Sequence, residues 1–240
     1  KEITSYKANL FVTASFGKIL PKELLEIPSM YSINIHPSLL PKYRGADPLF
    51  WQIVKQENKS GVSIFQMLPT LDNGPILKQK SFTIEKNETY SSLEHKCLQL
   101  GVKLLEELIC DIESNKNITP KNQNKNKLFY ARKRNSDDEL IDWTQKSIDI
   151  LALVRAFPSH IGAFTNLNAK RIKVIKAKET DFSNTNSKPG QISIHSRNLY
   201  VKCIDKHIQI EELKPEGKSI MKASDYINGN ISKNAVLFFK

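Results

Sequence analysis

Strand-like runs alternate with helix-like runs through the first 114 residues, and this alternation restricts the possible fold more than any other feature. Four short runs rich in apolar and β-branched residues are typical of strands: 10–15, 30–35, 61–68 and 75–84. Three stretches carry helix-start residues or three- and four-residue periodicity: 22–27, 48–57 and 88–113. We therefore predict an α/β domain over residues 1–114, with the first strand buried on both faces in a parallel sheet.

The pattern changes after residue 114. Residues 115–135 are rich in Asn and Lys and poor in apolar side chains, which is typical of a linker between domains. Beyond it, two predicted helices, 147–157 and 223–229, bracket a set of short strand-like runs: 162–166, 171–178, 191–195, 199–204 and 208–213. Several short strands with polar turns predict a small β-barrel, so we assign residues 136–240 to a second domain.

The positive charge is concentrated in the second half of the chain. Residues 1–120 carry 14 Lys and Arg against 13 Asp and Glu, whereas residues 121–240 carry 22 against 12. Of the net charge of +11, therefore, +10 belongs to the second half, and residues 116–134 contain no acidic residue. Such an asymmetry favours a polyanionic partner, nucleic acid before membrane; a plain compositional enrichment in Lys and Asn is the alternative.

Several protein classes are disfavoured. No apolar run approaches the roughly 20 residues of a membrane-spanning helix, and no signal peptide can be recognised in the polar first residues. Cys97, Cys110 and Cys203 are odd in number and lack metal-ligand spacing, so we expect buried free thiols, no disulfide and no metal site. A cytoplasmic protein is expected, and His95, His160, His195 and His207 are interpreted as structural.

The run Tyr31–Pro41 (YSINIHPSLLP) holds the sharpest local signal. Side chains alternate along a strand, so Asn34 and His36 point to the face opposite Ile33 and Ile35. They stand at the carboxyl end of the strand, where open α/β sheets place their ligand crevices. An amide and an imidazole aimed at one crevice can serve catalysis, although two hydrogen-bonded polar residues at a strand end would show the same pattern.

Two further loops are candidates. Asp72 lies in the turn Leu71–Pro75 (LDNGP), where it is either a turn former or, if the fold brings it beside His36, the carboxylate that orients and charges the ring. The loop Ser15–Pro21 (SFGKILP) follows the first strand and matches no dinucleotide or ATP phosphate motif.

Taken together, these motifs resemble the folate-dependent formyltransferases. The resemblance rests on Asn34–Pro41, on Lys42–Gly45 (KYRG) after it, and on Asp72–Gly74 (DNG). In the second half, the segments that resemble the C-terminal domain of the methionyl-tRNA formyltransferase family are IDW, VRAF, GAF and LKPEGK, at 141–143, 154–157, 162–164 and 213–218. Residues 158–161 (PSHI) depart from the family pattern, which places the local loop contacts in question.

The resemblance implies a Rossmann-like formyltransferase domain, a basic linker and an OB-like β-barrel that helps to hold tRNA. It implies transfer of the formyl group of 10-formyltetrahydrofolate to the α-amine of methionyl initiator tRNA, by a monomer without metal. The implied catalytic residues are Asn34, His36 and Asp72. The implied folate-binding residues are Phe16, Gly17, Lys18, Ile19, Leu20, Ser38, Leu39, Leu40, Pro41 and Leu71. The tRNA-binding candidates are Arg132, Lys133, Arg134, Lys170, Arg171 and Lys173.

Three other functions are open. The same catalytic trio would serve formylation of an amino sugar nucleotide or hydrolysis of formyl-folate, although a small substrate does not require so basic a second half. An inactive RNA-binding module is a third possibility. It follows from the expectation that the family's opening β–α units have no counterpart before Lys1, which would leave the sheet incomplete at its N-terminal side.

Overall fold

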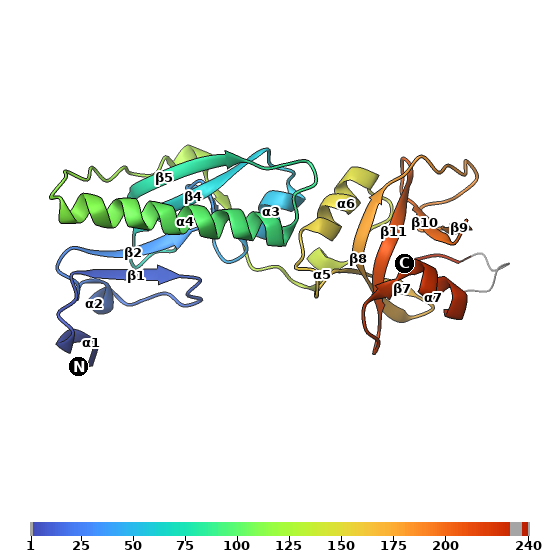
Figure 1. The fold of residues 1–240 in the computed structure, drawn as a ribbon, viewed down its shortest axis with the longest axis horizontal. Coiled ribbons are helices and arrows are strands. Elements are labelled where there is room, and N and C mark those ends of the chain that lie inside the picture. Colours follow the sequence, from blue (N-terminus) through green and yellow to red (C-terminus); the bar gives the residue numbers. More distant parts are fainter. Residues whose placement is uncertain (1, 231–236, 240) are drawn as a thin grey trace. The chain divides into compact units, whose positions relative to one another are not determined.

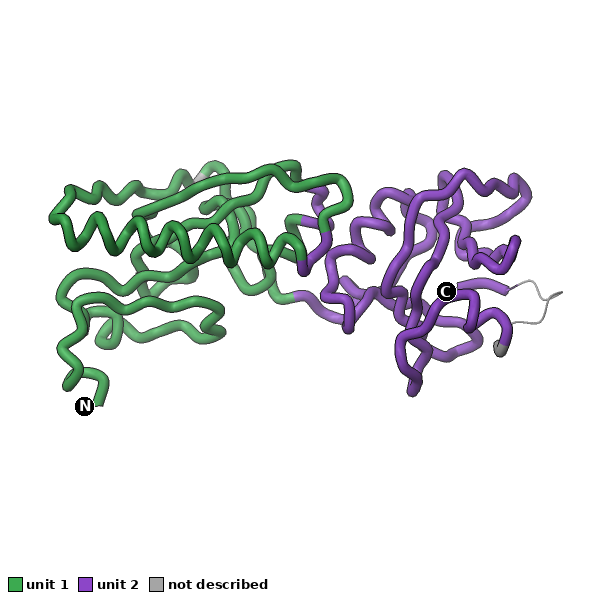
Figure 2. The backbone as a smooth tube through the Cα atoms, in the orientation of Figure 1, with its two compact units in different colours: residues 1–52, 57–88, 92–133 green, residues 53–56, 89–91, 134–240 purple. Residues whose placement is uncertain are grey.

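The computed structural model describes residues 2–230 and 237–239, and divides the chain into two compact units (Figure 2). The first unit contains residues 1–52, 57–88 and 92–133. The second contains residues 53–56, 89–91 and 134–240. Parts of the two predicted domains, residues 1, 231–236 and 240, lie outside the described residues. An α/β first part and a second part built on antiparallel strands are both observed, as the sequence predicts.

The first unit is built on a four-stranded sheet in the order β1-β2-β4-β5 (Figure 1). Its strands are β1 (Leu10–Ala14), β2 (Tyr31–His36), β4 (Lys59–Gln66) and β5 (Ile76–Thr83). Its helices are α1 (Glu2–Ser5), α2 (Lys22–Leu25), α3 (Pro48–Val54) and α4 (Tyr90–Glu113). β1 and β2 are parallel, whereas β2–β4 and β4–β5 are antiparallel.

The prediction that the first strand is buried on both faces in a parallel sheet is wrong. Among the described strands, β1 pairs only with β2 and forms the edge of a mixed sheet. Val12 in its middle is 44% exposed. An apolar β-branched run is compatible with an edge strand as well as a central one, because the sequence pattern reports side-chain type and not the number of neighbouring strands.

The long helix α4 covers one face of this sheet (Figure 1). The three- and four-residue spacing predicts a buried stripe, and Leu93, Cys97, Leu104 and Leu108 are buried as expected. Gly101 allows the helix to approach the sheet, because a Cβ atom there would lie 3.1 Å from the side chain of Ile35. Ile35 therefore faces the helix, and its neighbours along β2 face the other way.

The segment expected to be a linker, 115–135, packs with the first unit as far as Lys133. It contains a 3₁₀ turn, η1 (Lys125–Lys127), and a two-residue strand, β6 (Phe129–Tyr130), that pairs with β3 (Lys42–Arg44). Lys121 also forms two backbone hydrogen bonds of 2.8 Å with Ile76 at the start of β5. The segment thus supports two loops of the sheet.

The second unit is built on antiparallel strands in the order β7-β8-β11-β10-β9, with β12 paired to β11. The strands are β7 (Ala163–Leu167), β8 (Lys170–Glu179), β9 (Ile192–His195), β10 (Asn198–Lys202), β11 (His207–Pro215) and β12 (Met221–Lys222). The helices are α5 (Ser136–Glu139), α6 (Ser147–Arg155) and α7 (Ala223–Asn230). Side chains such as Ile172, Val174 and Leu213 fill its core.

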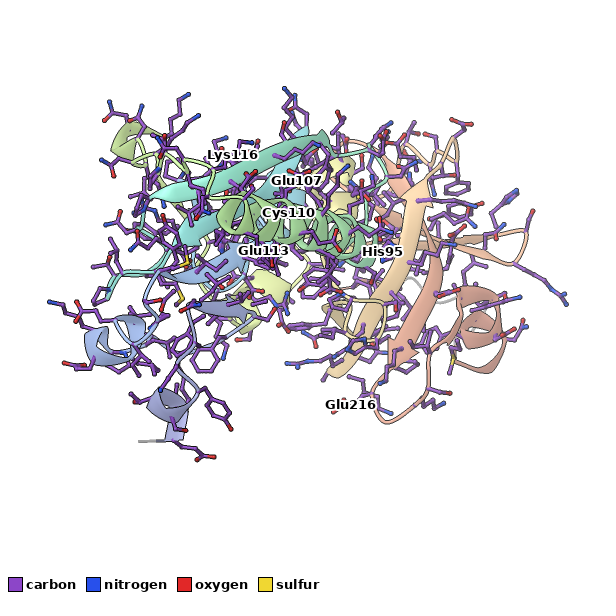
Figure 3. All side chains as sticks on the ribbon, turned by 60° about the vertical axis from the view of Figure 1, so that its left-hand side comes forward. His95, Glu107, Cys110, Glu113, Lys116 and Glu216 are labelled. Carbon is purple, nitrogen blue, oxygen red and sulfur yellow. The ribbon has the colours of Figure 1, made fainter. Side chains whose placement is uncertain are left out.

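The three cysteines are free, and two of them, Cys97 and Cys203, are buried as predicted. The prediction is wrong for Cys110, which is exposed because its position falls on the outer side of α4 (Figure 3). Within residues 2–230 and 237–239 no helix is long and apolar enough to cross a membrane. The same residues contain no group of three or more His, Cys, Asp or Glu side chains arranged to hold a metal ion.

Candidate active site

The candidate site begins on the face of β2 that is turned away from α4. Asn34 and His36 alternate with Ile33 and Ile35 along the strand, so both polar side chains lie on this face. The strand is a central one, held between β1 and β4 by a continuous register. The period-two argument from the sequence therefore positions the amide and the imidazole on a rigid element.

The imidazole of His36 is fixed by a backbone carbonyl. Its Nε2 lies 2.8 Å from the carbonyl oxygen of Tyr43, and because a carbonyl only accepts, Nε2 carries a proton and donates it. The ring is 4% exposed and meets Phe65 edge-on. Burial lowers the pKa of His36 below 6.5, while the Asp72 carboxylate and the Tyr43 hydrogen bond oppose that shift. A neutral ring therefore presents Nδ1 as an acceptor.

Tyr43 holds its carbonyl in place from an unusual backbone conformation. Its φ of 63° lies in the left-handed region, which costs a bulky residue free energy unless packing compensates. The phenol ring is buried against Phe129, with ring centroids 4.9 Å apart, and its hydroxyl donates to Glu57 at 2.7 Å. Burial raises the pKa of Tyr43, and the hydrogen bond to Glu57 raises it further, so the hydroxyl keeps its proton.

Asp72 reaches the ring from the turn between β4 and β5. One carboxylate oxygen, Oδ2, lies 3.8 Å from Nδ1 of His36 and accepts a hydrogen bond of 2.8 Å from the backbone N–H of Gly45. Asp72 itself has a positive φ of 45°, and the nearby Gly74 has no space for a Cβ, which would lie 1.6 Å from the carbonyl oxygen of Gln66. The tight turn thus brings the carboxylate beside the imidazole.

Asn34 completes the polar face. Its Oδ1 accepts a hydrogen bond of 3.0 Å from the hydroxyl of Thr13 on β1, which orients the amide. None of the described residues accepts a hydrogen bond from its NH₂ group. A fixed amide donor, an imidazole with a free acceptor nitrogen and a half-buried carboxylate are groups that acyl transfer can use: a donor for a developing oxyanion and a base for a departing proton.

The predicted folate residues fall into two structural classes. In the loop after β1, Phe16 and Ile19 are 55% and 68% exposed, and Leu71 beside Asp72 is 48% exposed. Gly17 and Lys18 are exposed as well, and Leu20 is half-buried. These side chains are accessible to a ligand.

The backbone of the turn Ser38–Pro41 is hydrogen-bonded to side chains of β4 and β5. Ser63 donates to the carbonyl of Ser38 at 2.6 Å and accepts from the N–H of Leu40, whose carbonyl accepts from Gln79. The side chains of Ser38, Leu40 and Pro41 are buried, and Leu39 is half-buried. Most of this turn therefore shapes the loop from its inner side, and the carbonyls of Ser38 and Leu40 and the N–H of Leu40 are already hydrogen-bonded.

The predicted tRNA residues also separate. Arg132 lies with its guanidinium 4.9 Å from the ring of Trp51, and the neighbouring Lys133 is exposed. Arg134 belongs to the second unit, where it lies 5.2 Å over Phe157 and 3.8 Å from Glu139. These contacts hold the two arginines against aromatic rings, with Arg132 exposed and Arg134 half-buried.

The candidates on β8 form part of one sheet face. Arg171 and Lys173 share that face with the Arg171 guanidinium 4.1 Å over Phe164, and Lys170 at the strand start is exposed. Lys173 lies directly opposite Lys214 of β11. Neither lysine has a carboxylate partner among the described residues. Like charges directly opposite each other destabilise a sheet, so this pair favours a bound anion.

Sequence reasoning did not identify Tyr43, Gly45 or Lys214 as site residues. Tyr43 and Gly45 act through backbone groups, which residue type does not reveal. The pairing of Lys173 with Lys214 depends on a register shift between β8 and β11. A helix or strand pattern contains no information about that register.

Comparison with known proteins identifies the family of the chain. Residues 1–109 match the family described as "Formyl transferase", and residues 133–230 match the family described as "Formyl transferase, C-terminal domain". The chain belongs to the formyl transferase family. The methionyl-tRNA formyltransferase of Natranaerobius thermophilus is 33% identical over 238 residues, which cover 98% of this family member and 76% of the relative. The methionyl-tRNA formyltransferase of Thermodesulfovibrio yellowstonii is 37% identical over 229 residues, which cover 95% of this chain and 73% of the relative.

Solved structures with a similar fold include two that hold folate compounds. The N-formyltransferase of Helicobacter canadensis, in complex with folinic acid and dTDP-3-aminofucose, superposes with a TM-score of 0.65 at 26% identity over 81% of this family member and 70% of that chain. HypX from Aquifex aeolicus, in complex with tetrahydrofolic acid, superposes with a TM-score of 0.68 at 18% identity over 92% of this chain and 39% of that chain. The second likeness shows the fold alone.

Proposed function

We propose that this formyl transferase moves the formyl group of 10-formyltetrahydrofolate to the α-amine of methionyl initiator tRNA. The observation that carries the proposal is the imidazole of His36 with Nδ1 free and 3.8 Å from the Asp72 carboxylate, in a chain whose relatives of that activity are 31–37% identical over about 95% or more of its length. The site supplies the chemistry, and the relatives supply the substrates. A cytoplasmic monomer stays a prediction.

The hydrogen bonds of His36 determine which ring nitrogen can accept a proton during transfer. Nε2–H is committed to Tyr43, so a neutral ring has Nδ1 to accept the proton that the attacking amine loses as its nitrogen bonds to the formyl carbon. The resulting imidazolium is stabilised by the Asp72 carboxylate. It can then donate that proton to the folate nitrogen as the bond from this nitrogen to the formyl carbon breaks, so that atoms and protons balance.

Asn34 provides the donor for the developing oxyanion. Its Oδ1 is held by Thr13, which leaves the NH₂ group to donate to the formyl oxygen. A donor already oriented before reaction costs no reorganisation when negative charge develops. We therefore assign oxyanion stabilisation first to Asn34. His36 can donate to this oxygen only after Nδ1 is protonated.

The folate is proposed to lie against the accessible apolar residues near this face, Phe16, Ile19 and Leu71, with Gly17, Lys18 and Leu20 beside them. Exposed large apolar side chains next to a polar catalytic face are typical of a pocket for a flat heterocycle. The turn Ser38–Pro41 contributes to the shape of this region through its hydrogen bonds with Ser63 and Gln79. No metal takes part in this proposal.

The nucleic-acid partner is proposed from charge. Arg171, Lys173 and Lys214 line one face of the second unit's sheet, and Lys173 and Lys214 have no acidic partner among the described residues. In the first unit, Arg132 and Lys133 form a separate group of exposed basic side chains in the segment after η1. Phosphate groups of tRNA would neutralise these charges, and a small acceptor would leave them without a function.

One alternative has a specific observation in its favour, since the Helicobacter canadensis relative was crystallised with an amino sugar nucleotide. Incubation with 10-formyltetrahydrofolate and one acceptor at a time separates the possibilities. We expect formyl-methionyl-tRNA to form at least 100-fold faster than a formylated dTDP-amino sugar, or than free formate without an acceptor, because an enzyme loses rate when remote binding contacts are removed. Faster formation of either other product, or tRNA binding without transfer, would contradict the proposal.

A further inference from the structure

Gln123 connects the basic segment after α4 to the turn that carries Asp72. Its Nε2 donates two hydrogen bonds, to the carbonyl oxygen of Asp72 at 2.9 Å and to that of Gly74 at 2.7 Å. Both donor positions of a single amide are therefore used on one three-residue turn. A turn with two of its carbonyls held by one rigid amide has little freedom to rotate its side chain away.

The acceptor end of the same amide is also held. Oε1 of Gln123 accepts from Nε and Nη2 of Arg44, at 2.9 and 2.6 Å. Arg44 is 3% exposed, and a buried guanidinium requires hydrogen-bond acceptors. Arg44 precedes Gly45, whose N–H binds the Asp72 carboxylate at 2.8 Å. Gln123 thus bridges the turn that bears the carboxylate and the loop that receives it.

The segment around Gln123 is itself anchored on both sides. Lys121 pairs with Ile76 immediately after the Asp72 turn, through two hydrogen bonds of 2.8 Å. At the other end, the N–H of Ala131 donates to the carbonyl of Arg44 at 2.7 Å. Gly45 allows this approach, because a Cβ there would lie 2.5 Å from the carbonyl oxygen of Ala131. The amide is therefore presented from a fixed backbone.

We propose that Gln123 is a positioning residue for the formyl-transfer reaction, which holds the carboxylate of Asp72 beside His36 by bridging the Asp72 turn to Arg44. This inference rests on the proposed function and names a residue outside the catalytic trio. Gln123 reaches neither Nδ1 of His36 nor the carboxylate oxygens of Asp72 by any hydrogen bond, so it acts through the backbone of the turn.

The consequence for His36 has a definite sign. The ring is surrounded by the Asp72 carboxylate, the Tyr43 carbonyl and the edge of Phe65, and of these the carboxylate is the charged group. Its negative charge raises the pKa of His36 against the effect of burial. Releasing the turn would move this charge away, so the pKa of His36 would fall and the imidazolium would be less stable during transfer.

The test uses the full chain with Gln123→Met, which removes both ends of the amide at similar length, and Asn122→Met as the matched control at the exposed neighbouring position. For Gln123→Met we expect kcat to fall about 10- to 100-fold with KM for both substrates within about twofold, because misplacement by about 1 Å can cost that much. Nitrogen-15 NMR should show a lower pKa for His36, and the Gly45 amide should exchange faster with solvent. Asn122→Met should match the wild type in every measurement.

A second variant covers the case in which Arg44, left without its acceptor, prevents folding. Gln123→Glu keeps an acceptor for Arg44 and removes both donors to the turn, so it should lose kcat and Gly45 amide protection. A folded variant of either kind with wild-type kcat and wild-type Gly45 exchange would overturn the proposal, as would a loss of rate that only follows the unfolded fraction. The NMR measurements need no acceptor substrate, so they decide on Gln123 even if methionyl-tRNA is not formylated.

Discussion

The two units hold their important charges in opposite ways. In the first unit, the Arg44 guanidinium is buried and the Asp72 carboxylate is half-buried, and an amide oxygen or a backbone N–H binds each of them. In the second unit, Lys173 and Lys214 are half-exposed and lie opposite each other without an acidic partner among the described residues. The protein itself sets the properties of buried charges, whereas the properties of exposed charges depend on salt and on what binds them.

The largest expected effect tests the buried side of this comparison. Asn34→Ala and His36→Ala should each lower kcat/KM for formyl transfer about 10²- to 10³-fold, because in the proposed mechanism each removes a group that acts on the reacting atoms. Steady-state kinetics together with a thermal melt of each variant provides the measurement. Near-wild-type turnover in either folded variant would remove that residue from the mechanism.

The pH dependence sharpens the same point. In the proposed mechanism transfer requires a neutral His36 ring, and burial lowers the pKa of this ring below 6.5, so kcat should stay level as the pH falls to 6.5 and decline only below the lowered pKa. Asp72→Asn removes the charge that raises this pKa and should move the decline to still lower pH, with a smaller kcat throughout. A decline that begins above pH 6.5 would contradict the assignment.

The free energy of unfolding should also depend on the protonation of His36. Below pH 6.5 the unfolded chain binds a proton on this histidine that the buried ring does not yet accept, so the free energy of unfolding falls as the pH is lowered. The fall ends below the pKa of the folded state. Urea unfolding of the wild type and His36→Gln between pH 7 and the lowered pKa isolates this contribution.

The smallest expected effect tests the exposed side. Lys173→Ala combined with Lys214→Ala should weaken tRNA binding and reduce the slope of log affinity against log salt by about two, one for each phosphate contact. Because these lysines lie outside the catalytic face, kcat at saturating tRNA should not change. Lys80→Ala, an exposed strand lysine of the first unit, serves as the control. An unchanged slope in the double variant would exclude the pair from the RNA interface.

The strands, helices and side-chain orientations that depend on local periodicity could be predicted from the sequence. The four long strands of the first unit and helix α4 follow from apolar spacing, and the shared orientation of Asn34 and His36 follows from the two-residue period of a strand. Edge position was not predictable, because β1 has the same apolar character that a central strand would have. Strands of two or three residues, such as β6 and β3, are too short to produce any period.

Long-range contacts within the site could not be predicted from residue type alone. Asp72 and His36 are 36 positions apart, and only the family resemblance suggested that they meet. Gln123 lies in a polar, Asn- and Lys-rich stretch that is typical of a linker, so nothing in its surroundings indicates a buried partner such as Arg44. The carbonyl of Tyr43 is equally hidden, since every residue has one and its use is decided by tertiary structure.

The packing of Tyr43 fixes the carbonyl that binds Nε2 of His36. A tyrosine in the left-handed region has no intrinsic preference to remain there, so the direction of its carbonyl is maintained by the packing of the phenol ring against Phe129 and by the hydroxyl's bond to Glu57. The tautomer of the His36 imidazole is consequently set by a buried aromatic contact that lies outside the proposed catalytic trio. We therefore expect the chemistry of this unit to depend on how well that buried ring is packed.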